Sequence, residues 1–309
     1  MKDTLKRSII EAAEAYRADK GMDQKAFSKF ARVNYSYYNA ARSGKFVYGK
    51  TVIDDAFFRT IARAIGFQLE TVYWPHRDTA QYVDVMTALH YSREKVEPRM
   101  IIGETGCGKT YAIDRFCEKN PVGVYRVTVN DYDTIRDILE EIIKALGVKI
   151  EARRGALLRG VCAALREQAI GGRKVMLIID EAENTKVPGL KAYKALYDLL
   201  KDFAALVLVG TPELPEKLES LRRKGVAGMP QFIRRFKAKT TRLEAVNRSF
   251  PDFRDTVSDD GIWRLASRLC DNYGELHDYL EPALREAQEN GEELTEESFR
   301  EMYNLSKAV

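Results

Sequence analysis

The spacing of hydrophobic positions divides the chain into three regions. Residues 1 to about 75 carry apolar side chains at helical spacing, together with many tyrosine, phenylalanine, lysine and arginine residues. From about residue 80 to residue 242, short apolar runs alternate with longer amphipathic stretches. Residues 243 to 309 return to helical spacing alone. The segment "YWPHRDT", residues 73–79, contains a proline and polar residues and is typical of a linker.

The middle region has the alternating pattern of an α/β domain. The expected strands are Met100–Ile102, Val122–Thr128, Val175–Ile179, Ala205–Val209 and Lys239–Leu243. The expected helices are Lys109–Lys119, Tyr132–Leu146, Gly155–Ala169 and Gly189–Lys201. Strands that alternate with helices form a parallel sheet with helices on both faces. We therefore predict an all-α domain over residues 1–75, an α/β core over 76–242 and a short helical part over 243–309.

Composition limits the class of protein without identifying it. The chain has 45% hydrophobic and 31% charged residues, which is ordinary for a globular protein. No apolar run is long enough to span a bilayer, and the N-terminal helix carries acidic residues that a signal peptide lacks. The four cysteines show no metal-ligand spacing. We expect a cytoplasmic protein with no membrane partner, and its net charge of +4 permits nucleic-acid binding without requiring it.

The junction "GETGCGKT" after the first expected strand has the spacing G-x-x-x-x-G-K-[ST]. Glycines let backbone N–H groups turn inward toward a phosphate, and the following helix directs its positive N-terminus to the same point. Lys109 would reach the β- and γ-phosphates, and the Thr110 hydroxyl would ligate Mg²⁺. The strand–loop–helix context argues against a chance match. The residues expected to contact the nucleotide here are Gly103, Glu104, Thr105, Gly106, Cys107, Gly108, Lys109 and Thr110.

Two later strands end in residues suited to hydrolysis of a nucleotide. "KVMLIIDEAEN" is an apolar strand that ends in Asp180, which would hold Mg²⁺, and Glu181, which would polarise the attacking water. The alternative is a solvated acidic turn. "LVLVGTPEL" ends at Thr211, whose hydroxyl would sense the γ-phosphate or orient the water, although Thr211 can equally cap the next helix.

Arg234 and Arg235 follow the Thr211 strand. Such arginines suit insertion into the nucleotide site of a neighbouring subunit, where a guanidinium stabilises charge in the transition state. The alternative is a basic surface patch.

The order of these motifs resembles the AAA+ ATPases. In that family ATP lies between the central sheet and a C-terminal helical lid, and the active form is usually a ring or a helical filament. Residues 271–287 resemble the sensor-2 helix of the lid, with His277 at the position usually held by an arginine. This departure implies that the contact from the lid to the γ-phosphate is weaker and pH-dependent, or missing.

The N-terminal part has the pattern of a helix-turn-helix unit. Residues 24–31 would form the first helix, and residues 36–41 would form the recognition helix. The alternative is a small helical module for dimerisation or packing. The residues expected to be exposed and to contact DNA are Tyr35, Tyr37, Tyr38, Asn39, Arg42 and Lys45.

A helix-turn-helix unit followed by a compact AAA+ module resembles the family of phage Mu B transposition proteins and transposon target-selection ATPases. The resemblance implies an ATP-bound assembly on double-stranded DNA that delivers the DNA to a transposase. Basic loops would neutralise phosphates without sequence preference. Their candidate residues are Arg153, Arg154, Lys186, Lys191 and Lys194, although ordinary solvated loop charge is the alternative. Two other functions stay open: a helicase loader or replication initiator, and an ATP-controlled transcriptional regulator.

Overall fold

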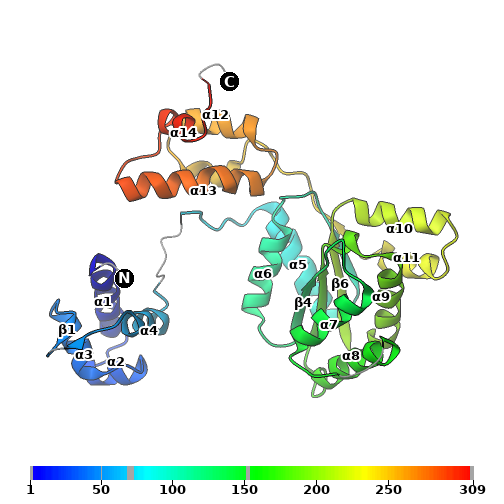
Figure 1. The fold of residues 1–309 in the computed structure, drawn as a ribbon, viewed down its shortest axis with the longest axis horizontal. Coiled ribbons are helices and arrows are strands. Elements are labelled where there is room, and N and C mark those ends of the chain that lie inside the picture. Colours follow the sequence, from blue (N-terminus) through cyan, green and yellow to red (C-terminus); the bar gives the residue numbers. More distant parts are fainter. Residues whose placement is uncertain (1–2, 50, 68–72, 151–153, 307–309) are drawn as a thin grey trace. The chain divides into compact units, whose positions relative to one another are not determined.

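The computed structural model describes residues 3–49, 51–67, 73–150 and 154–306. Contacts within the chain divide it into two compact units, Met1–Tyr73 and Trp74–Val309. Figure 1 shows the elements of both units, and each unit is described here by itself.

The N-terminal unit packs its helices around a small aromatic core that includes Phe27, Tyr38 and Phe58. Its helices are α1 (Asp3–Asp19), α2 (Gln24–Phe30), α3 (Tyr35–Arg42) and α4 (Asp55–Ile65). Helix α3 begins where the Asn34 side chain accepts hydrogen bonds from the N–H groups of Ser36 and Tyr37, which caps its first turn. The unit is not purely helical, because an antiparallel ribbon of β1 (Val47–Tyr48) and β2 (Thr51–Val52) lies between α3 and α4. The all-α prediction for this region missed that ribbon.

The larger part of the second unit is built on a parallel five-stranded sheet in the order β4-β5-β6-β3-β7. The strands are β3 (Arg99–Ile102), β4 (Val124–Thr128), β5 (Val175–Asp180), β6 (Ala204–Gly210) and β7 (Thr240–Arg242). The helices of this part are α5 (Ala80–Lys95), α6 (Lys109–Lys119), α7 (Ile135–Leu146), α8 (Arg154–Gln168), α9 (Val187–Leu200), α10 (Glu213–Arg223) and α11 (Met229–Lys237).

Helices cover both faces of the sheet, as the sequence pattern predicts. Successive side chains of a strand point to opposite faces. In β5, Leu177 and Ile179 pack among residues of α7, α8 and α9, whereas Met176 and Ile178 pack among residues of α5 and α6. Figure 1 shows these helices around the sheet. All six residues of β5 and all seven of β6 are buried. This two-sided burial explains why both strands are apolar throughout rather than alternating.

The connections bring several loops together at the carboxyl ends of the strands. Strand β3 lies between β6 and β7, whereas β4, the next strand along the chain, is the outermost strand on the other side of β6. In sheets of this kind, ligands bind beyond the carboxyl ends of the strands where the strand order reverses. The segments that follow β3, β5 and β6 meet at the carboxyl ends of these strands.

The C-terminal part of the second unit is helical. It contains the 3₁₀ segment η2 (Pro251–Thr256) and the helices α12 (Asp260–Leu269), α13 (Tyr273–Asn290) and α14 (Glu296–Met302). We refer to residues 243–306 as the lid. The lid has a core of its own around Trp263, whose indole N–H donates to the Val257 carbonyl at 3.0 Å. Within the described ranges, no helix of the chain has the length and apolarity needed to cross a membrane.

Candidate functional site

The glycine-rich loop connects β3 to α6 and has the backbone geometry of an anion cradle. Gly106 and Gly108 have φ angles of +71° and +91°, a region that residues with a Cβ rarely occupy. Gly108 is the N-cap of α6 and provides no side-chain cap, and among the described residues no side chain accepts from the N–H groups of this first helical turn. These free donors and the helix dipole together favour an anion such as phosphate.

Lys109 places its charge over this loop. The Nζ atom donates hydrogen bonds to the carbonyl oxygens of Gly103 at 2.7 Å and Glu104 at 2.8 Å. The neighbouring Cys107 is buried, and burial raises the pKa of its thiol. The loop cysteine is therefore a packed residue, and the lysine is the charged group that faces the ligand space.

Thr110 and Asp180 form a pair of oxygen ligands beside the loop. The Thr110 Oγ1 atom donates to Asp180 Oδ2 at 3.2 Å, although strand β6 separates β5 from β3 in the sheet. Asp180 is 1% exposed and also accepts the Glu181 N–H at 3.0 Å. Mg²⁺ is usually held by one or two protein oxygens together with phosphate oxygens and waters. The pair fits such an ion, and no cluster of three or more His, Cys, Asp or Glu side chains suited to a metal occurs in the part of the chain that the structure describes.

Glu181 has an unusual backbone conformation, with φ at +52° and ψ at +41°. A left-handed residue other than glycine stores strain, and such residues cluster at functional sites. The residue is exposed overall, but partial burial of its carboxyl group raises its pKa, and the charges of Asp180 and Glu183 raise it further. A raised pKa makes a carboxylate a stronger base. Asn184 Nδ2 donates to Glu181 Oε2 at 3.2 Å and orients it.

Arg126 is a site residue that the sequence analysis missed. Its Nη2 atom donates to Asp180 Oδ2 at 2.8 Å, and its Nη1 atom pairs with Asp114 on α6. The signal in the sequence was a single arginine inside the β4 run "VYRVT". That run alone did not indicate which carboxylates the arginine would meet.

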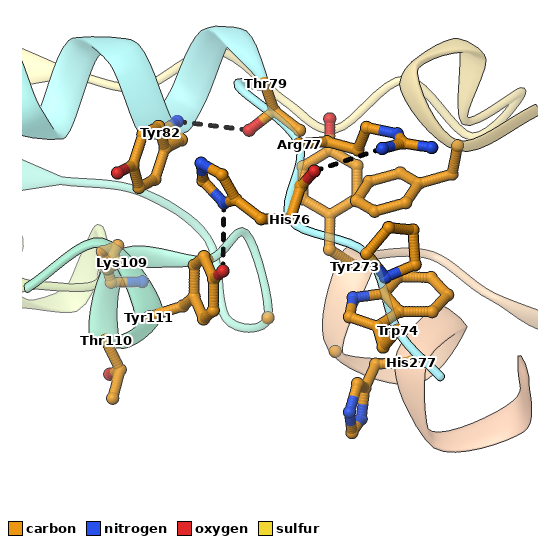
Figure 2. Close-up of a pocket in the computed structure, with 15 residues that line it drawn as sticks. Trp74, His76, Arg77, Thr79, Tyr82, Lys109, Thr110, Tyr111, Tyr273 and His277 are labelled. Atoms are coloured by element: carbon orange, nitrogen blue, oxygen red, sulfur yellow. Dashed lines mark hydrogen bonds between the residues drawn. The ribbon is translucent and has the colours of Figure 1, made fainter. Parts of the chain in front are cut away.

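An aromatic cavity of about 400 Å³ adjoins the glycine-rich loop (Figure 2). Its walls come from the segment 74–82, from the loop and the start of α6, and from the lid. The Tyr111 hydroxyl lies 3.0 Å from His76 Nδ1. The rings of His76 and Tyr82 pack edge to face, with their centres 4.7 Å apart. A cavity with aromatic walls beside a phosphate loop suits the base of a nucleotide. The sequence of residues 73–79 indicated only a linker, so this wall was not predicted.

A protein-family comparison agrees with this geometry. Residues 98–218 match the model of a family described as an AAA domain. Residues 98–218 form an AAA domain.

Known proteins similar to the chain extend the match beyond this domain. The DNA transposition protein B of the Mu-like prophage FluMu from Haemophilus influenzae is 27% identical over 152 residues. That match covers 48% of this chain and 49% of the relative, so the chain spans about half the length of the curated relative. The expected resemblance to AAA+ proteins of the Mu B type is confirmed at this level.

Solved structures share the fold. Cdc6p from Pyrobaculum aerophilum has 20% identity and a TM-score of 0.53, with 72% of this chain and 66% of that chain covered. The Aeropyrum pernix ORC1 protein, solved in complex with DNA, has 17% identity and a TM-score of 0.52, with 75% and 65% covered. These likenesses and the observed strand order confirm the predicted AAA+ fold class.

Thr211 follows β6, the strand that lies between the phosphate-loop strand and the Asp180 strand. Its N–H donates to Glu183 Oε1 at 3.2 Å. Among the described residues, its buried hydroxyl has no hydrogen-bond partner, and neither has Glu183 Oε2. A buried hydroxyl without a partner is costly unless a ligand completes it. Glu183 is a second residue that the sequence analysis did not single out.

The lid touches the glycine-rich loop of the AAA domain directly. The Gly274 N–H donates to the Gly106 carbonyl at 3.0 Å. A Cβ atom built on Gly106 would lie 2.1 Å from Asn272 Oδ1, so only glycine fits under this contact. His277 lies on α13 and lines the same cavity, with its ring edge-on to that of Trp74 and the two ring centres 5.6 Å apart. The candidate sensor-2 residue therefore faces the ligand space.

The segment 74–81 ties the lid to the AAA domain. Trp74 stacks on Phe253 with ring centres 4.7 Å apart, and Arg77 Nη2 donates to both carboxylate oxygens of Asp255. Buried Gln81 accepts a hydrogen bond from the Tyr273 hydroxyl at 3.2 Å and donates to the carbonyls of residues 244 and 245. A change in lid position would therefore move this segment.

The two candidate trans-acting arginines differ in their surroundings. Arg235 pairs with Asp198 of its own chain and lies over the ring of Tyr197 at 5.0 Å. Arg235 is thus held by its own chain, and the role of either arginine at a neighbouring subunit stays a prediction. Arg234 is exposed, and its side chain has no ion-pair partner within the described ranges.

The candidate DNA-contact residues of the N-terminal unit are not equivalent. Tyr38 is fully buried, and its hydroxyl donates to Glu14 Oε1 at 2.5 Å, so its expected exposure is wrong. It occupies the inward face of α3, where the core of the unit needs a large side chain. Arg42 pairs with the same Glu14 at 2.8 Å. Tyr37 and Asn39 are half-buried, whereas Tyr35 and Lys45 are exposed.

The basic loops expected to contact DNA are only partly described. Arg153 lies outside the described residues, and Arg154 begins α8 with a side chain that is also outside them. Lys186 is exposed and donates to the Tyr132 carbonyl at 3.1 Å, and Lys191 is exposed. Lys194 pairs with Asp198 at 2.9 Å, which reduces its value as a phosphate contact.

Proposed function

We propose that the chain binds ATP with Mg²⁺ and hydrolyses it to ADP and phosphate. The observation that carries this proposal is the contact between Thr110 and Asp180, which joins the glycine-rich loop to the acidic strand end. The aromatic cavity beside the loop would hold the base. Each of these features comes from a different part of the chain, and together they match the needs of one nucleotide.

The residues of the site would divide the work. Lys109 would bind the β- and γ-phosphates, and Thr110 and Asp180 would hold the ion, which supplies charge neutralisation when bound. Glu181 would take a proton from the attacking water, and its raised pKa suits that task. Thr211 would donate its free hydroxyl to the γ-phosphate or to the water.

Two substitutions test the nucleotide chemistry. Lys109→Ala should abolish ATP binding, because the loop loses its mobile cation. Glu181→Gln should bind ATP but stop turnover, because an amide cannot accept the proton. Equilibrium binding of a fluorescent ATP analogue and release of phosphate measure the two steps separately. Hydrolysis by Glu181→Gln at the parental rate would contradict the assignment of the base.

We propose further that the chain acts on DNA as a transposition accessory protein. The similarity to a DNA transposition protein B supports this role. In this proposal residues 1–75 capture DNA, residues 76–242 bind ATP, and residues 243–309 close over the nucleotide. Subunits would assemble on double-stranded DNA with ATP and deliver it to a transposase. The phosphate contacts would come from Lys186 and Lys191, with Arg153 and Arg154.

A salt titration of DNA binding with ATP, with ADP and without nucleotide tests this role. Affinity should fall with a slope of about −0.9 per neutralised phosphate, and only ATP should give tight binding. Replacing Arg153 and Arg154 together should lower that slope for all sequences alike. Equal affinity in the three nucleotide states would contradict an ATP-dependent assembly. A palindromic footprint would instead favour the transcriptional regulator, and stimulation by a replicative helicase rather than a transposase would favour the helicase loader.

A further inference from the structure

Arg126 joins two carboxylates, that of Asp180 in the candidate magnesium site and that of Asp114 on α6. Its guanidinium bonds Asp180 Oδ2 at 2.8 Å and also pairs with Asp114. The two acids differ in environment, since the Asp180 side chain is 2% exposed and the Asp114 side chain is 53% exposed. Arg126 Nε is buried and has no hydrogen-bond partner among the described residues. The guanidinium thus does not have all its donors satisfied where it lies.

The contact with Asp180 uses the same oxygen that faces Thr110. Asp180 Oδ2 accepts from both Arg126 Nη2 and Thr110 Oγ1, and Oδ1 accepts from the Glu181 N–H. Both oxygens of this carboxylate therefore already accept hydrogen bonds. A cation that binds between Thr110 and Asp180 would have to share Oδ2 with a guanidinium.

Charge makes that sharing unfavourable. A guanidinium stays protonated at all relevant pH values, so it always repels a neighbouring cation. The same charge stabilises the buried Asp180 carboxylate, which would be costly to leave unpaired. Arg126 therefore has two opposite effects at this site: it pairs with the buried Asp180 side chain, and it competes with a divalent ion for the same oxygen.

We propose that Arg126 is an internal competitor of Mg²⁺ at Asp180, and that it sets the Mg²⁺ concentration the nucleotide site requires. When Mg²⁺ with nucleotide binds, the guanidinium gives up Asp180 Oδ2 and keeps its pair with the more exposed Asp114. The inference rests on the proposed function, because it takes the Thr110–Asp180 pair to be the site of the ion.

The test is a Mg²⁺ titration of nucleotide binding in the full chain. The probe is a fluorescent, non-hydrolysable ATP analogue, so the readout does not depend on turnover. Arg126→Gln keeps a hydrogen-bonding side chain but removes the charge, and it should lower the half-saturating Mg²⁺ concentration by about tenfold or more. Arg126→Lys keeps the charge and should stay near the parental value.

Arg136→Gln is the matched control. Arg136 lies on α7, pairs with Glu140 at 2.6 Å and is 65% exposed, so its loss removes one positive charge away from Asp180. This variant should keep the parental Mg²⁺ requirement. An unchanged requirement in Arg126→Gln would show a purely structural ion pair, and a higher requirement would show that Arg126 prepares Asp180 for the ion. Either result overturns the competition.

Asp114→Asn provides a second variant in case Arg126→Gln does not fold. It removes the alternative partner of the guanidinium, so Arg126 depends more on Asp180 and the Mg²⁺ requirement should rise. A lower or unchanged requirement would contradict the proposal. If the parental chain binds no analogue at any Mg²⁺ concentration, the proposed nucleotide function fails. If it binds and the variants do not shift, only the role of Arg126 fails.

Discussion

The contact between the lid and the glycine-rich loop leads to a quantitative prediction for Gly106→Ala. The new Cβ would lie 2.1 Å from Asn272 Oδ1, far inside van der Waals contact, and Asn272 also caps α13 through the Glu275 N–H. The lid must then move away from the loop. The hydrogen bond from Gly274 to Gly106 would be lost with it.

Two terms lower the free energy of unfolding in Gly106→Ala. An alanine at the positive φ of Gly106 costs about 1 to 2 kcal/mol through backbone strain. The lost lid contact costs about 0.5 to 1.5 kcal/mol more, the net value of one hydrogen bond. Gly147→Ala is the matched control: Gly147 has a φ of +66° at the end of α7 and open space around its Cβ position. It should show the strain term alone.

Denaturant unfolding and hydrogen exchange separate the two terms. Gly106→Ala should lose more stability than Gly147→Ala, and the amides of residues 272–277 should exchange faster only in Gly106→Ala. Parental exchange rates at these amides in Gly106→Ala would refute the reasoning, because the lid would then tolerate the extra atom. Equal exchange changes in both variants would assign the effect to backbone strain rather than to the lid contact.

Three further predictions concern single residues. Glu183→Gln removes one of the charges that raise the pKa of Glu181, so the acid limb of the pH–rate profile should move to lower pH, and an unmoved limb would contradict this coupling. Tyr38→Phe should lower the stability of the N-terminal unit by about 1.5 to 3 kcal/mol, measured by thermal unfolding, because Glu14 loses a hydrogen bond. Tyr35→Ala should instead weaken DNA binding without lowering the stability of the unit. Arg234→Ala should reduce ATP hydrolysis by the assembly, and hydrolysis should partly recover when this variant is mixed with Glu181→Gln. Arg235→Ala should lower stability by about 0 to 1 kcal/mol and leave hydrolysis unchanged. The reverse pattern would assign the trans role to Arg235.

The sequence alone determined those features that depend on neighbours within a few residues. The predicted helix 109–119 matches α6 at both ends, because a glycine N-cap and an apolar face are local signals. The predicted strands Val175–Ile179 and Ala205–Val209 match β5 and β6 to within one residue at each end, since two-sided burial makes such strands apolar throughout. The sheet order brings the ends of these strands together, and the alternating pattern already implied a parallel sheet.

Only the tertiary structure decided which side chains meet across the chain. The periodicity of α3 indicated a helix, but burial of Tyr38 depends on the packing of α1 and α2 against it. Arg126 and Asp180 are 54 residues apart, and Arg77 and Asp255 are 178 residues apart, so no local pattern could pair them. A hydrophobic pattern shows which face of an element turns inward, but not which element covers that face. For this reason the glycine-rich loop was readable in the sequence, whereas the lid contact above it and the guanidinium beside it were not.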